Sequence, residues 1–356
     1  MASERKTRQW ETDLDGIQKL RFAESIVRLP ASDEILVKVA AVSLNYKDAE
    51  IINGLFKHHK SMVAVPNLVP CSDSCGQVVA VGDAVTKWKV GDRILSVSYP
   101  TYLTGPQHPK YLRTSIGSAN HGCLTEYRTF KETAVVACPS YLTNEEACNM
   151  QVAGTTAWMA INGMRPLGQP GGKGETILLQ GTGGVSIMGL LIGKASGAET
   201  ILTSSSDEKL QRGKDLGADH LINYRKTPNW DEEVLRLTSG KGADIIFENG
   251  GALTTPKSFN CVAFGGLINA IGYVSGKIDP PDERLNINVS ALSRNMTIKG
   301  LINGPRDRFQ EMLDFCAKHE IRPVVDKTFP FEQAREALQY MWDGAHFGKV
   351  VINVAQ

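Results

Sequence analysis

The stretch that decides the fold is Thr176-Ile177-Leu178-Leu179-Gln180-Gly181-Thr182-Gly183-Gly184-Val185-Ser186. It begins as a short apolar run typical of a buried strand, passes through a glycine-rich turn and leads into Ile187–Ser196, which is typical of a helix. Backbone N–H groups at such a helix N-terminus bind phosphate groups. Gly181 permits the tight turn, Gly183 permits close approach of a pyrophosphate, and Ser186 stands where a third glycine would pack the helix on the strand. We expect a dinucleotide-binding turn with a slightly wider helix–strand spacing; the alternative is a glycine-rich turn that binds no nucleotide.

The same alternation of short apolar strands with helices runs from about Thr143 to Ile298. It predicts a parallel, doubly wound sheet with helices on both faces, and six strands complete a Rossmann sheet. We therefore predict an α/β fold with a Rossmann cofactor-binding domain at residues 151–299. The predicted strands are 176–179, 200–203, 221–224, 244–247, 266–271 and 296–298, and the predicted helices are 145–164, 187–196, 207–216 and 231–238.

Before about Pro139 the pattern differs, because short apolar runs are separated by turns. This pattern predicts a β-rich, barrel-like domain at residues 1–150, onto which we expect residues 300–356 to fold back. Residues 99–120, rich in Tyr, Pro, Ser and Gly, predict a long loop that is either functional or a surface insertion. The predicted strands of this domain and the tail are 35–39, 77–81, 92–95, 324–329 and 349–354.

Composition excludes several classes of function. A chain of 356 residues is too long for one ordinary hydrophobic core, so two domains are expected. Lys and Arg total 39 and Asp and Glu total 38, which gives no electrostatic reason to expect nucleic acid or a membrane as a partner. No apolar run is long enough to span a bilayer, and Met1–Trp10 lacks the apolar core of a signal peptide. Seven scattered cysteines indicate free thiols in a reducing compartment, so we expect a cytoplasmic protein that binds a small molecule.

The end of the second Rossmann strand indicates which dinucleotide binds. NAD sites place a carboxylate there to hold the ribose hydroxyls, whereas this strand ends in Ser204, Ser205 and Ser206. Hydroxyls and the nearby Lys209 can donate to a 2′-phosphate, and Tyr224 at the end of the third strand is placed to close over the same site. These residues favour NADP(H).

Two alternatives stay open at this position. Asp207 follows the strand only slightly later than an NAD-binding carboxylate would, and it can reach a ribose. Ser205 and Glu208 have the spacing of a capping box, so the serine can serve only to begin the next helix.

Several segments match one family in the order in which that family uses them. They cover nearly the whole chain, and on them the chain resembles the medium-chain dehydrogenase/reductase superfamily, in particular its zinc-free branch similar to quinone oxidoreductases. The resemblance implies a GroES-like N-terminal catalytic domain completed by the tail, an active site between the domains, and a dimer or tetramer. We expect a homodimer formed through the edge strand of the Rossmann sheet, near 267–274. The matching segments are 43–48, 76–82 with 90–93, 122–127, 152–158, the glycine turn, 216–220 and 347–351.

The resemblance also implies site residues. Asn45 and Asp48 belong near the nicotinamide, where Asn45 can hydrogen-bond the substrate carbonyl or the ribose, and Tyr46 or Lys47 can donate a proton to a developing enolate. In the alternative interpretation, Asp48 only orients Asn45 or caps a helix, and Tyr46 is a core aromatic. Phe56 stands at a substrate position. The expected cofactor-binding residues are Thr155, Gly181, Thr182, Gly183, Gly184, Val185, Ser204, Ser205, Lys209, Tyr224, Asn249, Gly272, Leu301, Asn303 and Lys349.

We expect no metal. Zinc-dependent relatives hold a catalytic zinc through Cys, His and Glu residues, and the corresponding segments 45–48, 70–76 and 151–154 do not supply such a set. Cys71 and Cys75 are interpreted as buried thiols. The histidines 58, 59, 108 and 121 have no ligand spacing.

Without a Lewis acid, hydride transfer favours an acceptor that stabilises its own negative charge. The expected activity is therefore zinc-independent, NADPH-dependent reduction of a quinone, an α,β-unsaturated carbonyl or another activated double bond. The alternatives are a biosynthetic, polyketide-type enoyl reductase, a zinc-free alcohol dehydrogenase-like enzyme and, from another class, a cofactor-binding protein without turnover.

Overall fold

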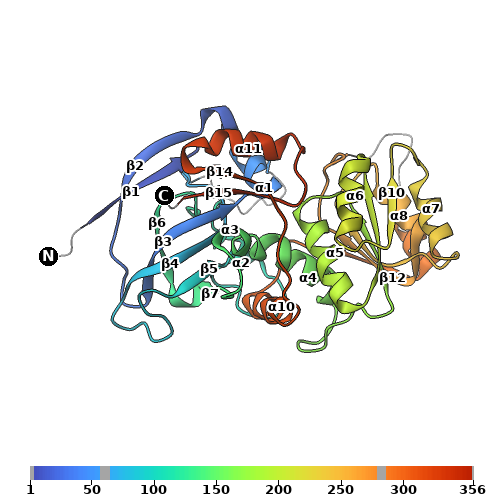
Figure 1. Ribbon diagram of the computed structural model, residues 1–356, viewed down its shortest axis with the longest axis horizontal. Helices are drawn as coiled ribbons and strands as arrows, with labels where there is room; N and C mark the ends of the chain where they lie inside the picture. Colours follow the sequence, from blue (N-terminus) through green and yellow to red (C-terminus); the bar gives the residue numbers. More distant parts are fainter. Residues whose placement is uncertain (1–3, 57–64, 279–285, 355–356) are drawn as a thin grey trace. The chain divides into compact units, whose positions relative to one another are not determined.

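The computed structural model describes residues 4–56, 65–278 and 286–354 and divides the chain into two compact units (Figure 1). One unit joins Met1–Thr155 to Gly304–Gln356, and the other is Thr156–Asn303. The chain therefore leaves the first unit once and returns to it. These boundaries lie within five residues of the expected ones.

The described residues of the first unit form a seven-stranded sheet in the order β14-β15-β3-β4-β5-β7, with β6 paired to β3. Strand β15 comes from the tail and runs antiparallel to β3, with Val351 opposite Ser43. The tail therefore supplies a strand to the N-terminal sheet. The bounds are β3 Glu34–Ser43, β4 Asp73–Val81, β5 Arg93–Ser96, β6 Tyr127–Lys131, β7 Val135–Ala137, β14 Val325–Pro330 and β15 Lys349–Asn353.

Short helices and a separate strand pair surround this sheet. Strands β1 (Arg5–Glu11) and β2 (Arg21–Val27) pair antiparallel. Residues 99–120 are irregular apart from one short helix, α2, as the sequence predicted. The helices of this unit are α1 Tyr46–Ile52, α2 Pro109–Leu112, α3 Asn144–Ala147, α10 Arg306–Lys318 and α11 Ala334–Trp342.

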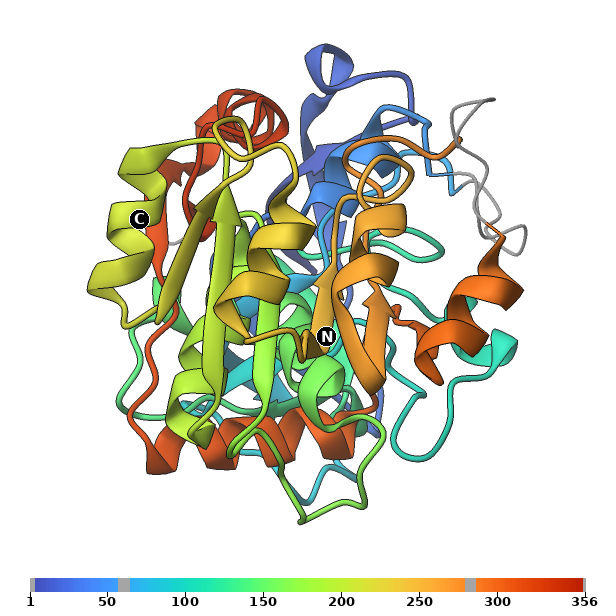
Figure 2. The same ribbon diagram turned by 90° about the vertical axis from the view of Figure 1, so that its right-hand side faces the viewer.

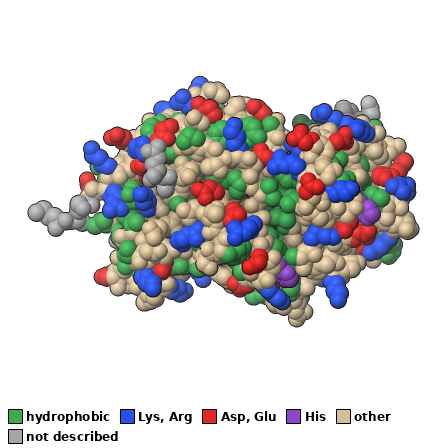
Figure 3. Space-filling view, viewed as in Figure 1, with side chains coloured by type: hydrophobic (Ala, Val, Ile, Leu, Met, Phe, Trp, Pro, Cys, Tyr) green, Lys and Arg blue, Asp and Glu red, His purple; other side chains and the backbone are tan. Residues whose placement is uncertain are grey.

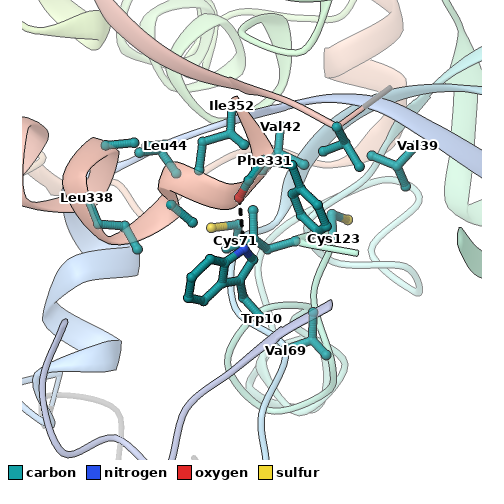
Figure 4. Close-up of a cluster of buried hydrophobic side chains, with 14 of the residues drawn as sticks. Trp10, Val39, Val42, Leu44, Val69, Cys71, Cys123, Phe331, Leu338 and Ile352 are labelled. Carbon is teal, nitrogen blue, oxygen red and sulfur yellow. Dashed lines mark hydrogen bonds between the residues drawn. The ribbon is translucent and has the colours of Figure 1, made fainter. Parts of the chain in front are cut away.

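Trp10 joins the N-terminal strand to the tail in the core of this unit (Figure 4). Its indole Nε1 donates to the backbone oxygen of Phe331 at 2.9 Å, so the one polar atom of the ring is satisfied inside the core. Cys71 and Cys123 lie in the same cluster as free, buried thiols, and Cys75 is also buried.

The second unit is built on a six-stranded sheet in the order β10-β9-β8-β11-β12-β13, in which every neighbouring pair is parallel (Figure 2). This confirms the predicted α/β fold with a Rossmann-like sheet. The strands are β8 Thr176–Gln180, β9 Glu199–Ser204, β10 His220–Asn223, β11 Ala243–Glu248, β12 Val262–Ala270 and β13 Thr297–Gly300. The helices are α5 Gly184–Ser196, α6 Asp207–Asp215, α7 Trp230–Leu237, α8 Thr255–Cys261 and α9 Ile287–Arg294.

The predicted helix 145–164 is not continuous. The segment forms α3, a π-turn at Met150–Gly154 and the helix α4 (Thr155–Asn162). The break has a local cause, because the side-chain amide of Asn149 donates to the backbone oxygens of Glu145 and Glu146, in competition with the helical hydrogen bonds. π-turns are frequent at functional sites, and this one presents a backbone N–H to the polar cluster described below.

The close contact between α5 and the sheet falls at Gly189 rather than at Ser186. A Cβ atom on Gly189 would lie 2.6 Å from Phe247 Cε2 and 2.9 Å from Leu179 Cδ2, closer than packed carbon atoms come. Ser186 instead donates its hydroxyl to the backbone oxygen of Gln180 at 2.7 Å. The expected wider spacing is therefore wrong, since the glycine that permits close packing lies about one turn later.

The edge strands of the Rossmann-like sheet are β10 and β13, so the segment 267–274 is not an edge. Strand β12 lies between β11 and β13 and is hydrogen-bonded on both sides. The sequence predicted β13 itself, at 296–298, but the pattern of apolar runs does not give the order of the strands, so the edge was placed one strand too early.

The surface agrees with the balanced composition. On the face that Figure 3 shows, Lys and Arg side chains are interspersed with Asp and Glu. None of the helices in the described ranges is long and apolar enough to cross a membrane.

Candidate active site

Asn45 begins helix α1 and lies in a buried polar cluster of the first unit. It is the N-cap residue, and its backbone N–H donates to Asp48 Oδ2 at 2.9 Å, so Asp48 both caps the helix and holds Asn45. This is the structural role left open as an alternative for Asp48. Both residues are buried, with Asp48 fully excluded from solvent.

The side-chain amide of Asn45 is committed inside the cluster. Its Oδ1 accepts from Lys349 Nζ at 2.7 Å, and its Nδ2 donates to Asp73 Oδ2 at 3.1 Å. These contacts differ from the expected hydrogen bond to a substrate carbonyl or ribose. Lys349, expected at the cofactor, is 4% exposed and also donates to the backbone oxygen of Leu44 at 2.5 Å, so it holds the cluster together instead.

Lys47 lies at the more accessible side of the cluster. Its Nζ donates to Asp48 Oδ1 at 3.0 Å and to Ser72 Oγ at 2.9 Å. Ser72 in turn donates to Asp73 Oδ1 at 2.7 Å. The Lys47 side chain is 23% exposed and that of Asp48 is 0% exposed, so Lys47 is the more accessible member of this ion pair.

The cluster pairs two ammonium groups with two carboxylates. Burial tends to lower the pKa of Lys47, but Asp48 and Asp73 outweigh it and raise that pKa overall. Burial lowers the pKa of Lys349, which the same two carboxylates offset only in part. Burial likewise raises the pKa of Asp73 against the opposing effect of the two lysines. Lys47 is therefore the group of the cluster that is held most firmly in its protonated form.

Tyr46 and Phe56 do not join this cluster in the structure. Tyr46 is 37% exposed and its ring stacks on Trp342, with centroids 5.0 Å apart and planes 15° apart. It is therefore not a core aromatic. Burial, followed by Glu50, raises the pKa of Tyr46. Phe56 is half-buried, at the end of a described range.

Two residues of the cluster, Ser72 and Asp73, were missed as site residues. From the sequence, residues 70–76 were expected to matter only as the counterpart of a zinc-binding segment, and no zinc was expected there. The signal that points to them is the register of β3 and β4, in which Asp73 lies opposite Ser43, close to the start of α1. That pairing brings together residues that are far apart in the sequence.

No group of three or more His, Cys, Asp or Glu side chains within the described ranges can hold a metal ion. His108 Nδ1 accepts from the backbone N–H of Lys110 at 3.2 Å, and His121 Nδ1 accepts from that of Val69 at 3.2 Å. His58 and His59 lie outside the described residues.

The second unit presents the glycine-rich turn in the form that the sequence predicted. Gly181 has a φ of 78°, which a residue with a side chain rarely adopts. Gly183 is the N-cap of α5, and a Cβ atom there would meet no described atom within 4 Å. Thr182, Gly184 and Val185 complete the turn. The space beside Gly183 at the N-terminus of α5 is therefore open, as the predicted pyrophosphate site requires.

A buried carboxylate braces this turn. Glu248, at the end of β11, is 1% exposed and accepts from five donors, while Gln180 Oε1 accepts from the backbone N–H groups of Asn249 and Gly250 at 3.1 and 3.2 Å. The side chain of Asn249 donates to Gln180 O at 3.1 Å and to Ser186 Oγ at 3.0 Å, so Asn249 supports the turn rather than presenting its amide to a ligand. The donors to Glu248 are Gln180 Nε2 at 2.8 Å, Gly250 N at 3.0 Å, Gly251 N at 2.9 Å, Thr254 Oγ1 at 2.5 Å and Ser258 Oγ.

The residues expected at the 2′-phosphate lie together at the ends of β9 and β10. The backbone N–H of Tyr224 donates to Ser204 O at 3.1 Å, and Lys209 is half-buried in the first turn of α6. Ser206, not Ser205, caps α6 by accepting from Lys209 N at 3.3 Å, so the capping box proposed for Ser205 and Glu208 is wrong.

Asp207, the alternative ligand for an NAD ribose, is already bound to two neighbouring side chains. Its carboxylate accepts from Asn223 Nδ2 at 2.6 Å and pairs with Lys226 Nζ. Both contacts favour its charged form, since these side chains lower the pKa of Asp207. An NAD ribose would have to compete with them for this carboxylate.

The residues expected near the nicotinamide are distributed over both units. Thr155 Oγ1 is buried and has no hydrogen-bond partner among the described residues, which fits a hydroxyl that binds a ligand. A Cβ on Gly272 would lie 2.7 Å from Asn249 O, so glycine is needed there for packing. Leu301 and Asn303 are buried at the end of the second unit.

Comparisons with known proteins agree with this arrangement. One family model, the alcohol dehydrogenase GroES-like domain, matches residues 31–140, and another, zinc-binding dehydrogenase, matches residues 184–318. A zinc-type alcohol dehydrogenase-like protein of Schizosaccharomyces pombe is 37% identical over 321 residues, covering 90% of this chain and 91% of that protein. A crystal structure of a putative alcohol dehydrogenase from Sinorhizobium meliloti 1021 has a TM-score of 0.84 at 35% identity, covering 99% of this chain and 100% of that one. The chain belongs to the medium-chain dehydrogenase/reductase superfamily and is an oxidoreductase that uses a nicotinamide cofactor.

The branch of the superfamily depends on which relatives are most similar to the chain. A quinone oxidoreductase of Pseudomonas aeruginosa is 28% identical and covers 90% of this chain and 91% of that protein. The zinc-type relatives are thus more similar to this chain than that quinone oxidoreductase is. The comparisons therefore support the superfamily and leave the branch, the substrate and the use of zinc to the proposal below.

Proposed function

We propose that the protein is a metal-independent, NADPH-dependent reductase of activated double bonds, such as those of α,β-unsaturated carbonyls or quinones. The observation that carries the proposal is the Lys47 ammonium group, which is held by two neighbours in a network that contains no metal-binding set among the described residues. A fixed ammonium group can stabilise and protonate a developing enolate. A metal ion would be needed as a Lewis acid to reduce an unactivated carbonyl. For an activated double bond, the ammonium group of Lys47 takes that role.

The chemistry divides between the cofactor and the chain. When bound, NADPH would supply a hydride to the β-carbon of the double bond, which would leave an enolate for the chain to protonate. Lys47 Nζ then gives one proton to the enolate and takes another from solvent, so the product gains two hydrogen atoms in all. Asp48 and Ser72 hold Lys47 during this step. The raised pKa of Lys47 keeps the donor protonated at neutral pH.

NADP(H) is favoured over NAD(H) by the residues at the end of β9. Ser204, Ser205 and Lys209 offer donors for a 2′-phosphate, and no carboxylate stands at the strand end. The carboxylate of Asp207, which follows the strand, is already bound to Lys226 and Asn223.

Replacing Lys209 with alanine should remove the preference for NADPH. Losing one charged phosphate contact costs roughly 1.5–3 kcal/mol, which is about tenfold or more in Kd. Fluorescence titration with NADPH and NADH measures the effect. Lys214→Ala, which removes an exposed lysine from the same helix, is the matched control. Equal affinities for the two cofactors in the unaltered protein would contradict the assignment and point to Asp207 as a ribose ligand.

An acceptor screen tests the reaction itself. We expect NADPH oxidation with enones, enals and quinones, and little with saturated ketones. Oxidation of simple alcohols that requires added zinc would instead support the activity named in the zinc-type relatives. Stable NADPH binding without turnover on any acceptor would support a cofactor-binding protein.

We further propose a homodimer formed through the edge strand β13. Helix α9, beside β12, exposes Ile287, Val289 and Leu292, and Ile298 of β13 is 40% exposed. Apolar residues beside an unpaired strand favour pairing with a second copy. Light scattering should therefore give twice the mass of the chain, and the mass of a single chain at micromolar concentration would contradict this. The cytoplasmic location remains a prediction.

A further inference from the structure

The direction of the Lys47 ammonium group is determined by its neighbours. An ammonium group has three N–H donors in a tetrahedral arrangement. Two of them are bound, to Asp48 Oδ1 at 3.0 Å and to Ser72 Oγ at 2.9 Å, and the third has no partner among the described residues. Because the N–H bonds are arranged tetrahedrally about Nζ, fixing the directions of two of them also fixes the direction of the third.

The Ser72 hydroxyl can accept a hydrogen bond from Lys47 because its own proton is donated to another residue. A hydroxyl group has one proton, and that of Ser72 goes to Asp73 Oδ1 at 2.7 Å. The lone pairs of Ser72 Oγ are thereby left to accept from Lys47. The backbone of Ser72 is fixed as well, since its carbonyl oxygen accepts from Ser96 Oγ at 2.7 Å.

Asp73 is in turn fixed by three separate parts of the unit. It begins β4, opposite Ser43 of β3. Its Oδ2 accepts from Asn45 Nδ2 at 3.1 Å and from the backbone N–H of Val152, in the π-turn, at 3.0 Å. The carboxylate is fully buried, so it has no freedom to turn toward solvent.

We infer that Ser72 and Asp73 are positioning residues, which aim the third N–H of Lys47 at the substrate and keep its proton in place. This inference rests on the proposed function, in which Lys47 is the proton donor. The two residues touch Lys47 or each other rather than the reacting atoms. Such alignment matters because a displacement of about 1 Å can cost about 100-fold in rate.

Several charged and titratable groups face Lys47 from the elements packed around it. The two carboxylates act to keep it protonated, while the second ammonium group acts against this. The set is Asp48 from α1, Asp73 from β4, Lys349 from β15, Tyr99 from the loop after β5, and Cys71. Removing the charge of Asp73 should therefore lower the pKa of Lys47, because the remaining groups do not replace it.

The test uses Ser72→Ala and Asp73→Asn in the full chain, with Ser74→Ala as the matched control. Ser74 is also buried, and its hydroxyl interacts with Cys123. We expect kcat with NADPH and an enone to fall about tenfold to 100-fold in both test variants, with little change in the KM for NADPH. As the pH is raised, Asp73→Asn should also lose activity at a lower pH than the unaltered protein does. The reason is that a proton donor with a lower pKa loses its proton at a lower pH. Ser74→Ala should match the unaltered protein.

A second measurement needs no turnover. Reductive methylation with formaldehyde and cyanoborohydride modifies only unprotonated amines, and mass spectrometry of the peptide that contains Lys47 gives its rate in the apo protein. We expect faster modification of Lys47 in Asp73→Asn than in the unaltered protein and in Ser74→Ala. Unchanged modification together with an unchanged pH profile would overturn the inference.

The experiments distinguish failure of the proposed function from failure of the positioning role of Ser72 and Asp73. If the unaltered protein reduces no acceptor, the proposed function fails, and the methylation rates still report whether Asp73 holds the proton on Lys47. If it turns over normally and Ser72→Ala does too, the proposed function stands and the positioning role is wrong. Circular dichroism melting curves show whether Asp73→Asn folds, and the milder Ser72→Ala keeps the inference testable if it does not.

Discussion

Replacing Lys47 with methionine is expected to lower kcat for double-bond reduction by about 10²- to 10⁴-fold, the range in which positioned general acids contribute. Methionine keeps much of the length of the side chain and removes its charge and its donors. The affinity for NADPH should change little, because the residues placed at the phosphates lie in the other unit. Stopped-flow measurement of NADPH oxidation under single-turnover conditions gives the rate of the chemical steps.

A matched lysine controls for loss of charge. Lys131 is 64% exposed and pairs with Asp33 at 3.0 Å, so Lys131→Met removes an ion pair on the surface without touching the cluster. It should reduce the acceptor at the normal rate. A Lys47→Met protein that binds NADPH and retains more than about a tenth of the normal rate would contradict the role of Lys47 as proton donor.

Replacing Glu248 with leucine is expected to have the largest effect on stability. Glu248 accepts from five donors while 1% exposed, so its loss removes an acceptor from a side-chain amide, two hydroxyls and two backbone N–H groups. The amide of Gln180, the hydroxyl of Thr254 and the N–H of Gly250 each keep one other acceptor, whereas the N–H of Gly251 and the hydroxyl of Ser258 lose the one that Glu248 gives them. Each buried donor without a partner costs about 1–3 kcal/mol. Allowing for local rearrangement, we expect the free energy of unfolding of the second unit to fall by at least about 3 kcal/mol.

The same substitution should weaken cofactor binding. Gln180 Nε2 donates to Glu248 and to Ser258, which is itself bound to Glu248, and Gln180 Oε1 holds the backbone beside the glycine turn. Urea denaturation followed by circular dichroism measures stability, and NADPH titration measures binding. Glu232→Gln, on the exposed face of α7, should change stability by less than about 0.5 kcal/mol. A Glu248→Leu protein as stable as Glu232→Gln would show that the buried network does not support the turn.

Local patterns were sufficient to predict the Rossmann-like sheet. The alternation of short apolar strands with helices and the turn at Gly181–Gly184 depend on residues close together in the sequence, and the parallel six-stranded order follows from them. The patterns failed where a single side chain decides the outcome. Asn149 ends α3 by competing for backbone oxygens, and Gly189 takes the packing role expected at position 186.

The candidate site was predicted only in part, for a similar reason. The segment 45–48 was identified from its resemblance to a family, and its four residues lie where α1 begins. Ser72 and Asp73 reach them only through the pairing of β3 with β4, which a single sequence does not specify. Lys349 also enters from the tail, as part of β15, and its burial beside Asn45 follows from that strand's place next to β3.

The central claim is that hydride from NADPH reduces a carbon–carbon double bond without a metal, and isotope transfer tests it most directly. The unaltered protein is dialysed against a chelator and incubated with an enone and NADPH that carries deuterium at C4, using each of the two labelled faces in turn. We predict that one face transfers its deuterium to the β-carbon of the saturated ketone product, at a rate that the chelator does not change. Deuterium on the carbonyl carbon of an alcohol product, or turnover that returns only when zinc is added, would contradict the account.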